Sequence, residues 1–473
     1  MHSALLVDEL LQEVFNLCCS GNEYRKTLVQ LARCCQAWKE PALRKAWETL
    51  PCVTPLMDLF TMSSVSPEEF SNYARMVKHV RLGAKTKEKI ALGASVYDTT
   101  PLFPNLQSVA VLMDGCAASA VHLLLSPMLS TVTIDIGVST GRATGAERSG
   151  NIATYLSSLR SSSIPTQKLC IRGFACEKLN AAVSSLSTLK SLSLKVGTSL
   201  STRTVADIAN FPFLEELFVH ADRVDADSLE ESLASSSPVF PNIRTLDIRS
   251  SIEVAATILR HARSTTFTKL SIEVTRNEGT TWTRLYSVIP TTVQDIHIDY
   301  HIDLDEPTSD TTDTNNDHSL TIGKLEPLSK LTLRAFTLDT NIPVNLADKD
   351  VGTLTRWWPT LKILDLIVSA HEGCKENEDQ EAQMISWTPK LTLGCLSTIA
   401  KDWPHLEHLR LPINLAARFD QVQVQDFPVH TRLREFRIDP SLPCKSRTPL
   451  IDTNIAFIRN LFPSARNDFS VSN

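Results

Sequence analysis

The chain has 473 residues, of which 42% are hydrophobic and 21% are charged, a composition that is ordinary for a globular protein. One hydrophobic core does not extend over such a length, so several domains or a repeat array are expected. The net charge of −6 comes without any basic tract, which argues against a nucleic-acid partner.

Neither a secretion signal nor a membrane span is expected. The first residues lack the basic region of a signal peptide and reach an acid at Asp8. No apolar run approaches the ~20 residues that cross a bilayer. The eleven cysteines show no framework spacing, which is typical of reduced thiols. These features predict a soluble protein of the cytoplasm or nucleus with no membrane partner.

The first helix is expected to be apolar over too much of its surface for a single contact. Successive residues of an α-helix advance by about 100°, so the apolar side chains from Leu6 to Leu17 cover about half of the circumference. One core contact needs a stripe of about 100°. The surplus predicts a second apolar partner, either the following repeats or another protein.

This apolar arc has two halves. Leu10 and Val14 lie near the middle of one half, and Leu11 and Phe15 lie on the other. One half should pack inside the module and the other should stay exposed until a partner covers it. The helical angles leave open which half points outward.

The first fifty residues resemble the F-box family. The family pattern runs leucine-proline, a spacer, glutamate, two aliphatic residues and an aliphatic-aromatic pair, followed later by a cysteine and a tryptophan. The matching residues are Leu6, Glu9, Leu10, Leu11, Val14, Phe15, Leu31, Cys34 and Trp38. Val7 stands where the family usually has proline.

The resemblance implies a three-helix F-box-like domain at residues 1–55, followed by a connection at 56–75. It also implies that the matching residues bind the linker subunit of a cullin-based ubiquitin ligase. The alternative is that residues 1–50 only cap the end of a repeat array, which such arrays require. An F-box can also do both.

From about residue 76 onward one short pattern returns: an apolar residue, two others, an apolar residue, one other, and an apolar residue. Leu189–Leu194, Leu214–Val219 and Ile243–Ile248 are three copies. The central apolar residues of the copies stand at positions 80, 109, 132, 169, 192, 217, 246, 270, 296, 331, 364, 409 and 436. Neighbouring centres lie 23 to 45 residues apart. Most gaps fall within the ~20–29 residue period of leucine-rich repeats.

Segments between the copies show helical patterns, as at Thr204–Phe211 and Val254–His261. Residues 76–473 therefore resemble the leucine-rich-repeat family. The implied fold class is α/β, a leucine-rich-repeat solenoid with parallel strands inside and helices outside. A doubly wound α/β domain is the alternative, but its strands are more continuously apolar than these alternating ones. The family's asparagine five places after the central leucine occurs only at Asn414, so irregular repeats are expected.

The sequence predicts no enzyme, and we assign no catalytic, cofactor-binding or metal-ligating residue. The motifs of nucleophilic hydrolases, phosphate loops and zinc helices do not occur. One run, Asp295 to Asp305, alternates so that its histidines and aspartates share one face of a strand. Such a face could attract a divalent cation or a basic peptide. It is also the one feature of the sequence on which an enzymatic function could rest. We favour a polar inner face of the sheet, continuing into an acidic loop at 306–318.

Residues that flank the central apolar positions should line the concave face of the solenoid. Charge accumulates there toward the C-terminus, so target contacts are expected in that half, with Phe218 as an apolar anchor. The candidate target-binding residues are Glu216, Phe218, Asp247, Asp295, His297, Arg334, Asp365, Arg410 and Arg437.

The whole chain is similar to F-box-like proteins with irregular leucine-rich repeats of the fungal type. This resemblance implies a substrate-recognition adaptor of a cullin-based, SCF-type ubiquitin ligase. Its partners would be the linker subunit, the cullin and a protein target that the sequence does not identify. The alternative is a leucine-rich-repeat interaction scaffold unconnected with ubiquitin, in which the helical block is only an end cap.

Overall fold

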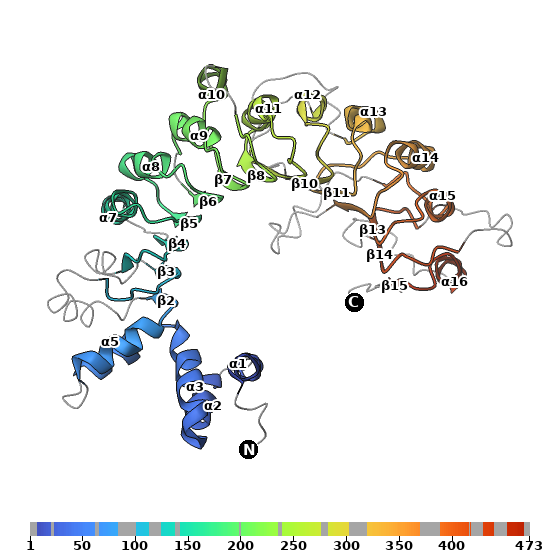
Figure 1. Cartoon of the computed structure of the whole chain (residues 1–473). Coiled ribbons are helices and arrows are strands. Elements are labelled where there is room, and N and C mark those ends of the chain that lie inside the picture. The colour runs from blue at the N-terminus through green and yellow to red at the C-terminus, as the bar shows by residue number, and fades with distance from the viewer. Residues whose placement is uncertain are drawn as a thin grey trace, which may run out of the picture. The chain divides into compact units, whose positions relative to one another are not determined.

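A computed structural model describes fourteen segments of the chain (Figure 1). They are residues 7–19, 23–61, 66–83, 101–112, 124–137, 142–197, 200–234, 239–275, 282–301, 319–368, 388–415, 417, 429–438 and 452–467. The chain divides into two compact units. Unit 1 comprises Met1–Leu214 with Phe218–His220, and unit 2 comprises Glu215–Leu217 with Ala221–Asn473.

Unit 1 begins with helices and continues with alternating strands and helices. Its helices are α1 (Asp8–Leu17), α2 (Tyr24–Cys34), α3 (Gln36–Glu48), α4 (Thr54–Thr61), α5 (Pro67–Met76), α7 (Arg142–Ser161), α8 (Glu177–Ser184) and α9 (Thr202–Ala209). Its strands are β1 (Thr49–Leu50), β2 (His79–Leu82), β3 (Ser108–Leu112), β4 (Thr131–Asp135), β5 (Lys168–Gly173) and β6 (Ser191–Val196). Strand β7 (Glu216–His220) spans the boundary between the units.

Unit 2 repeats the strand and helix alternation. Its strands are β8 (Thr245–Ser250), β9 (Lys269–Val274), β10 (Asp295–Tyr300), β11 (Ala335–Thr340), β12 (Ile363–Val368), β13 (His408–Leu411), β14 (Glu435–Ile438) and β15 (Arg466–Asn467). Its helices are α10 (Ala226–Ala234), α11 (Ile252–His261), α12 (Trp282–Val288), α13 (Ile322–Leu325), the 3-10 helix η4 (Glu326–Lys330), α14 (Asp348–Trp357), α15 (Cys395–Asp402) and α16 (Asp452–Leu461).

Within each unit the strands pair in parallel and in chain order. In unit 1 the strand pairing places these residues opposite one another on successive strands: Val80, Val109, Val132, Leu169 and Leu192. In unit 2 the residues placed in this way are Leu246, Leu270, Ile296, Phe336, Leu364, Leu409 and Phe436. The predicted repeat centres are thus confirmed in these strands, with one exception at position 331.

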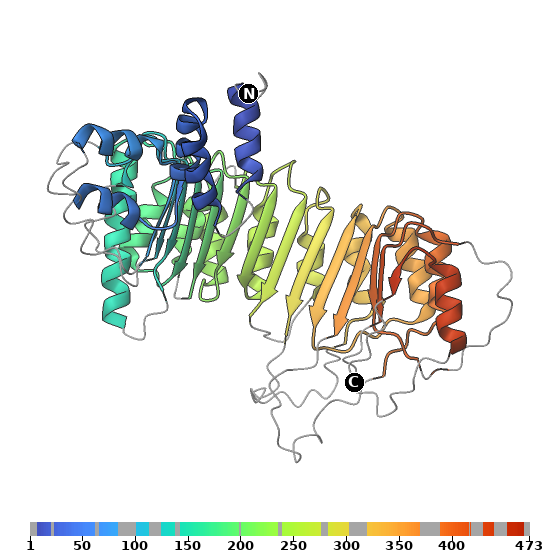
Figure 2. The same ribbon diagram turned by 90° about the horizontal axis from the view of Figure 1, so that it is seen from below.

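Helices cover one side of the sheet in each unit and leave the other side open (Figure 1, Figure 2). Buried and partly exposed residues alternate along the strands, and in β8 and β12 every second residue is buried. The apolar residues pack under the helices, and the polar ones point to the side without helices, called the open face below. Each unit is therefore a stretch of an α/β leucine-rich-repeat solenoid, as the sequence predicts.

The strand centre predicted at Leu331 is wrong. Leu331 follows the 3-10 helix η4, and the strand itself is β11, with Phe336 at the position that pairs with Ile296. The chain matches the repeat pattern twice in succession here, at Leu328-x-x-Leu331-x-Leu333 and at Leu333-x-x-Phe336-x-Leu338. All the apolar residues of both matches are buried. Burial therefore does not distinguish the two, and pairing with β10 selects the second.

The sheet begins earlier than the predicted start at residue 76. Thr49 and Leu50 of β1 pair with His79 and Val80 of β2. Helices α4 and α5 occupy most of the segment that the sequence analysis treats as a connection. Helix α5 starts at a capping box in which Ser66 accepts from the backbone N–H of Glu69, and the Glu69 side chain accepts from that of Ser66. The domain boundaries at 55 and 75 stay predictions.

Ring side chains in unit 2 donate hydrogen bonds between repeats, a role that asparagines have in regular leucine-rich repeats. Nε1 of Trp358 donates to the carbonyl oxygen of Leu328 at 3.1 Å, and Nε1 of Trp403 donates to that of Trp358 at 2.9 Å. Nε2 of His430 lies 2.8 Å from the carbonyl oxygen of Trp403. Nδ1 of His430 accepts from the N–H of Leu433, so Nε2 carries the proton and donates. Each of these carbonyls also accepts the backbone N–H three residues further on, from Leu331, Leu361 and Leu406, so the ring donors add a second hydrogen bond that links successive repeats.

Among the described helices, none is both long enough and apolar enough to cross a membrane.

Candidate functional site

Helix α1 resolves the two halves of its apolar arc. Leu11 and Phe15 are each only 1% exposed and form a small core with Leu28, Ala42 and Ala46 of α2 and α3. Leu10 and Val14 point away from this core and are 50% and 43% exposed. The half with Leu11 and Phe15 is therefore the inward one.

The exposed half is a continuous apolar stripe along α1. Val7, at the N-cap, and Leu17, at the last helical position, are also exposed, Leu17 by 70%. Positions 7, 10, 14 and 17 have the i, i+3, i+7 spacing that aligns side chains on one face of a helix. Four large apolar side chains exposed in a row form a surface suited to another protein.

The other residues that match the F-box pattern have mixed positions. Trp38 and Leu31 are half-buried and pack against the small core, where the Trp38 ring meets Phe15 edge-on at 6.2 Å between centroids. Glu9 is exposed on α1. Cys34 is exposed at the end of α2, and its Sγ lies 3.4 Å from the carbonyl oxygen of Gln30. Leu6 lies outside the described residues.

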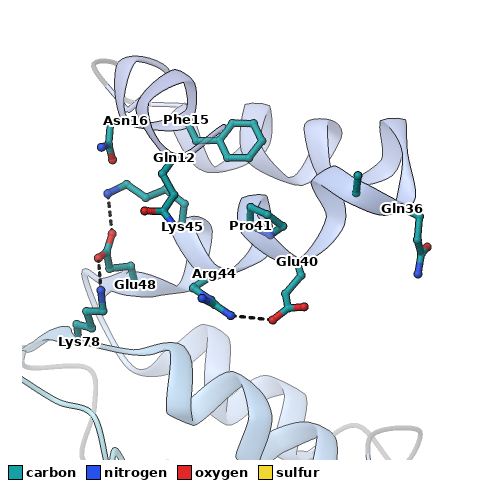
Figure 3. Close-up of a pocket in the computed structure, with 11 residues that line it drawn as sticks. Gln12, Phe15, Asn16, Gln36, Glu40, Pro41, Arg44, Lys45, Glu48 and Lys78 are labelled. Atoms are coloured by element: carbon teal, nitrogen blue, oxygen red, sulfur yellow. Dashed lines mark hydrogen bonds and ion pairs between the residues drawn. The ribbon is translucent and has the colours of Figure 1, made fainter. Parts of the chain in front are cut away.

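A polar cleft of about 540 Å³ lies between α1 and α3 and reaches the start of β2 (Figure 3). The residues that line it are Gln12, Phe15, Asn16, Gln36, Ala37, Glu40, Pro41, Arg44, Lys45, Glu48 and Lys78. Its charged side chains are paired with one another: Arg44 with Glu40 at 2.7 Å, and Glu48 with both Lys45 and Lys78. These three cations exceed the two carboxylates by one, and each of them is paired, so the cleft offers no unpaired charge to a ligand.

Glu48 ties the helical block to the sheet. Its carboxylate lies 2.6 Å from Nζ of Lys45 on α3 and 3.0 Å from Nζ of Lys78, next to β2. Partial burial alone would raise the pKa of Glu48, but the hydrogen bonds from Lys45 and Lys78 outweigh it and lower the pKa below its usual value. The ionised form is therefore favoured by folding.

Glu48→Gln is expected to reduce the stability of the N-terminal helices at neutral pH by up to about 1 kcal/mol. Because the folded pKa is depressed, the contribution of Glu48 is present above its unfolded pKa near 4.5 and disappears as the pH falls through the folded pKa. Denaturant unfolding of both proteins at pH 7 and pH 3 measures this. The difference between them should be smaller at pH 3 than at pH 7, and an equal difference at both values would contradict the ion-pair explanation.

Most of the predicted target-binding residues lie on the open face of unit 2, and several form one row across the strands. The residues of this row, which lie opposite one another on successive strands, are Asp247, Ser271, His297, Thr337, Asp365, Arg410 and Arg437. Asp295 lies in the adjacent row, next to Lys269, at 3.9 Å between Nζ and the carboxylate. Glu216 and Phe218 are half-buried residues of β7, one in each unit.

Arg334 is not on this face. It immediately precedes β11, where its carbonyl accepts from the N–H groups of Lys362 and Ile363 and its own N–H donates to Gln294. The misplaced repeat centre at Leu331 explains the error, because it made Arg334 a strand residue. The side chain is exposed at the edge where the strands begin.

A third row on the same face was missed by the sequence analysis. It consists of Arg249, Glu273, Asp299 and Asp339, which are paired in register on β8 to β11. Asp299 was expected on one face of its strand with Asp295 and His297, but the candidate target-binding residues included none of the four residues of this row. Extending the two-residue alternation one step further along each strand would have found this row.

Ion pairs only partly neutralise the third row. Nη1 of Arg249 lies 3.1 Å from Glu273, and Nε of Arg249 lies 3.2 Å from Asp222. Nε2 of His301 lies 3.1 Å from Asp299 and 3.3 Å from Asp339. Burial and the carboxylates of Asp299, Asp222 and Asp247 raise the pKa of Glu273, although Arg249 opposes them. The region therefore has a surplus of negative potential.

The first part of the histidine and aspartate run is a strand, β10, in which Asp295, His297 and Asp299 share the open face, whereas His301 follows the end of the strand. Asp303 and Asp305 lie outside the described residues. In the part of the chain that the structure describes, no group of three histidine, cysteine or acidic residues is arranged to hold a metal ion.

No protein-family model and no curated protein matches the sequence. The solved structures that match this chain include the following two. A chain in the crystal structure of the TLR13–ssRNA13 complex matches 78% of this chain at 13% identity, with a TM-score of 0.41, and the match covers 44% of that chain. A chain in the crystal structure of the Rad7–Elc1 complex from yeast matches 75% of this chain at 11% identity, with a TM-score of 0.34, and the match covers 87% of that chain. This chain thus matches less than half of the TLR13 chain.

Proposed function

We propose that this protein is a substrate-recognition adaptor of a cullin-based ubiquitin ligase. The apolar stripe of α1 docks the linker subunit, and the open face of the sheet binds the target. The protein's contribution is positional, because it holds a target near a ligase that performs the transfer. No residue of this chain carries out chemistry in the proposal, and no cofactor is needed.

The observation that carries the proposal is the division of α1 into an inward and an outward apolar half. A helix that only caps a solenoid needs one apolar face, and in α1 Leu11 and Phe15 already supply it. Leu10, Val14 and Leu17 are additional, and exposing them is unfavourable in water. The resemblance of this segment to the F-box gives the stripe a specific partner.

One observation favours the second candidate, a repeat scaffold with a helical cap. Strand β1 directly follows α3 and pairs with β2, and Glu48 bridges α3 and β2. The helical block is thus built onto the end of the sheet, as a cap would be. The two functions are compatible, and only the ligase function requires the stripe of α1.

Mass spectrometry of proteins that co-purify with the tagged full chain distinguishes the two candidates. The ligase adaptor should recover a linker subunit and a cullin, and Leu10→Asp with Val14→Asp should lose both while keeping the target. Asn72→Asp, at an exposed position on α5, is the matched control. Recovery of targets without any ligase subunit from the unaltered chain would favour the scaffold.

A further inference from the structure

Like charges stand in direct register on the open face of unit 2. Asp299 on β10 pairs with Glu273 on β9 and with Asp339 on β11. Neighbouring strands lie about 4.8 Å apart, and like charges directly opposite each other destabilise a sheet. Uncharged residues would serve the fold better at these partly exposed positions. Arg249 beside Glu273 and His301 beside Asp299 and Asp339 offset only part of this repulsion, and a partner would have to offset the rest.

The surplus of acid extends over the outward positions of β8 to β12. These positions hold six carboxylates, namely Asp247, Glu273, Asp295, Asp299, Asp339 and Asp365, and two permanent cations, namely Arg249 and Lys269. The side chains there are partly exposed, so the described chain leaves this face uncovered. A partner that neutralised these carboxylates would remove the repulsion among them.

An excess of acidic side chains is not a general property of the open face. The outward positions of β2 to β6 in unit 1 hold one carboxylate, Asp135, and four permanent cations, namely Arg81, Lys168, Arg172 and Lys195. Two stretches of the same repeat fold therefore differ in the sign of their charge. The acid of unit 2 is specific to that unit.

Apolar side chains lie beside the carboxylates. Ile363 and Ile367 on β12 point outward on either side of Asp365 and are half-buried. Ile367 pairs with Asp339, and Ile363 pairs with Ala335 on β11. Lysine and arginine suit such a surface, because their aliphatic stems cover apolar groups while their charged ends reach carboxylates.

We propose that the open face of β9 to β12 binds an extended, lysine- or arginine-rich segment of the target protein. Glu273, Asp299 and Asp339 receive the cationic groups, and Ile363 and Ile367 contact the stems. The assignment of this segment to the target rests on the proposed function. A lysine-rich segment also brings acceptor amines for ubiquitin close to the adaptor.

Fluorescence anisotropy with the full chain tests this surface. The probe is a labelled peptide of alternating lysine and leucine of about eight residues, which spans roughly 25 Å when extended. Peptides with glutamate or serine in place of lysine are its comparisons. The lysine peptide should bind and the glutamate peptide should not. Raising the salt concentration should weaken the binding, because exposed charges are screened.

Asp299→Asn with Asp339→Asn should weaken binding of the lysine peptide about tenfold or more. The control, Asp227→Asn with Glu231→Gln, removes two exposed carboxylates from α10 on the helical side of the same unit and should leave binding unchanged. The melting temperature of the double asparagine variant should change little, because the substitutions remove a repulsion together with the charged contacts of both carboxylates to His301. Weaker binding is then not a consequence of unfolding.

Equal binding of the lysine and glutamate peptides would overturn the inference, as would equal losses in the two double variants. These outcomes are independent of the ligase proposal, because none of the four substitutions touches α1. A chain that binds the linker subunit but discriminates no peptide contradicts this inference alone. A chain that binds the lysine peptide but no linker subunit contradicts the ligase proposal alone.

Discussion

Phe15→Asp is expected to unfold the N-terminal helical block, whereas Val14→Asp at the preceding position leaves it folded. Phe15 is 1% exposed in the small core, where an unpaired charge costs several kcal/mol. Val14 is 43% exposed, so its replacement costs no more than about 1 kcal/mol, mostly from the apolar contacts of its covered part. Hydrogen exchange of the backbone amides of α1, α2 and α3 in the full chain measures both effects.

Leu11→Asp and Leu10→Asp form a second pair with the same expected contrast. The backbone amides of α1, α2 and α3 should exchange as fast in the Leu11 variant as in the Phe15 variant. In the Leu10 variant they should stay protected. Rapid exchange in all four variants would mean that the outward stripe is needed for folding. The stripe would then be part of a cap, and the argument for a partner on α1 would fail.

Trp403→Phe should destabilise unit 2 by about 3 kcal/mol. The substitution removes the indole N–H that reaches the carbonyl oxygen of Trp358, and it leaves that buried acceptor with only the backbone N–H of Leu361. It also leaves a cavity, because Trp403 is fully buried. Urea unfolding, followed by a probe in unit 2, gives the change in the free energy of unfolding.

Tyr286→Phe is the matched control for this prediction. Tyr286 is also fully buried in unit 2, but its hydroxyl has no hydrogen-bond partner among the residues that the structure describes. Removing an unpartnered buried hydroxyl should be neutral or stabilising. Similar losses in both variants would show that ring burial alone accounts for the cost, and that the hydrogen bonds between repeats contribute little.

The sequence predicted the strands well because the evidence for them is local. Alternation of apolar and polar residues within six positions identifies a strand and its inward face, and this holds from Val80 to Phe436 in the strands with confirmed register. The prediction of a strand centre at Leu331 was wrong, because two matches to the repeat pattern share Leu333. A choice between them depends on which residue pairs with Ile296, a contact 40 residues away that no local pattern contains.

The functional surfaces were predicted less completely. Helical angles identified the surplus apolar arc of α1 but not its outward half, because that depends on where α2 and α3 pack. The missing asparagines were recognised, but their replacement was not. Trp403 bonds to a carbonyl 45 residues earlier, so nothing in its own neighbourhood reveals the contact. The acidic row of Glu273, Asp299 and Asp339 needed the register of three strands.

Binding of the purified full chain to the purified linker subunit of a cullin-based ligase tests the central claim most directly. Isothermal titration should show a one-to-one complex at micromolar concentrations or below. The Leu10→Asp, Val14→Asp double variant should show no heat of binding while its helices stay protected from hydrogen exchange, and Asn72→Asp should bind as the unaltered chain does. No binding by the unaltered chain, or undiminished binding by the double variant, would contradict the assignment of the α1 stripe as the ligase-docking surface.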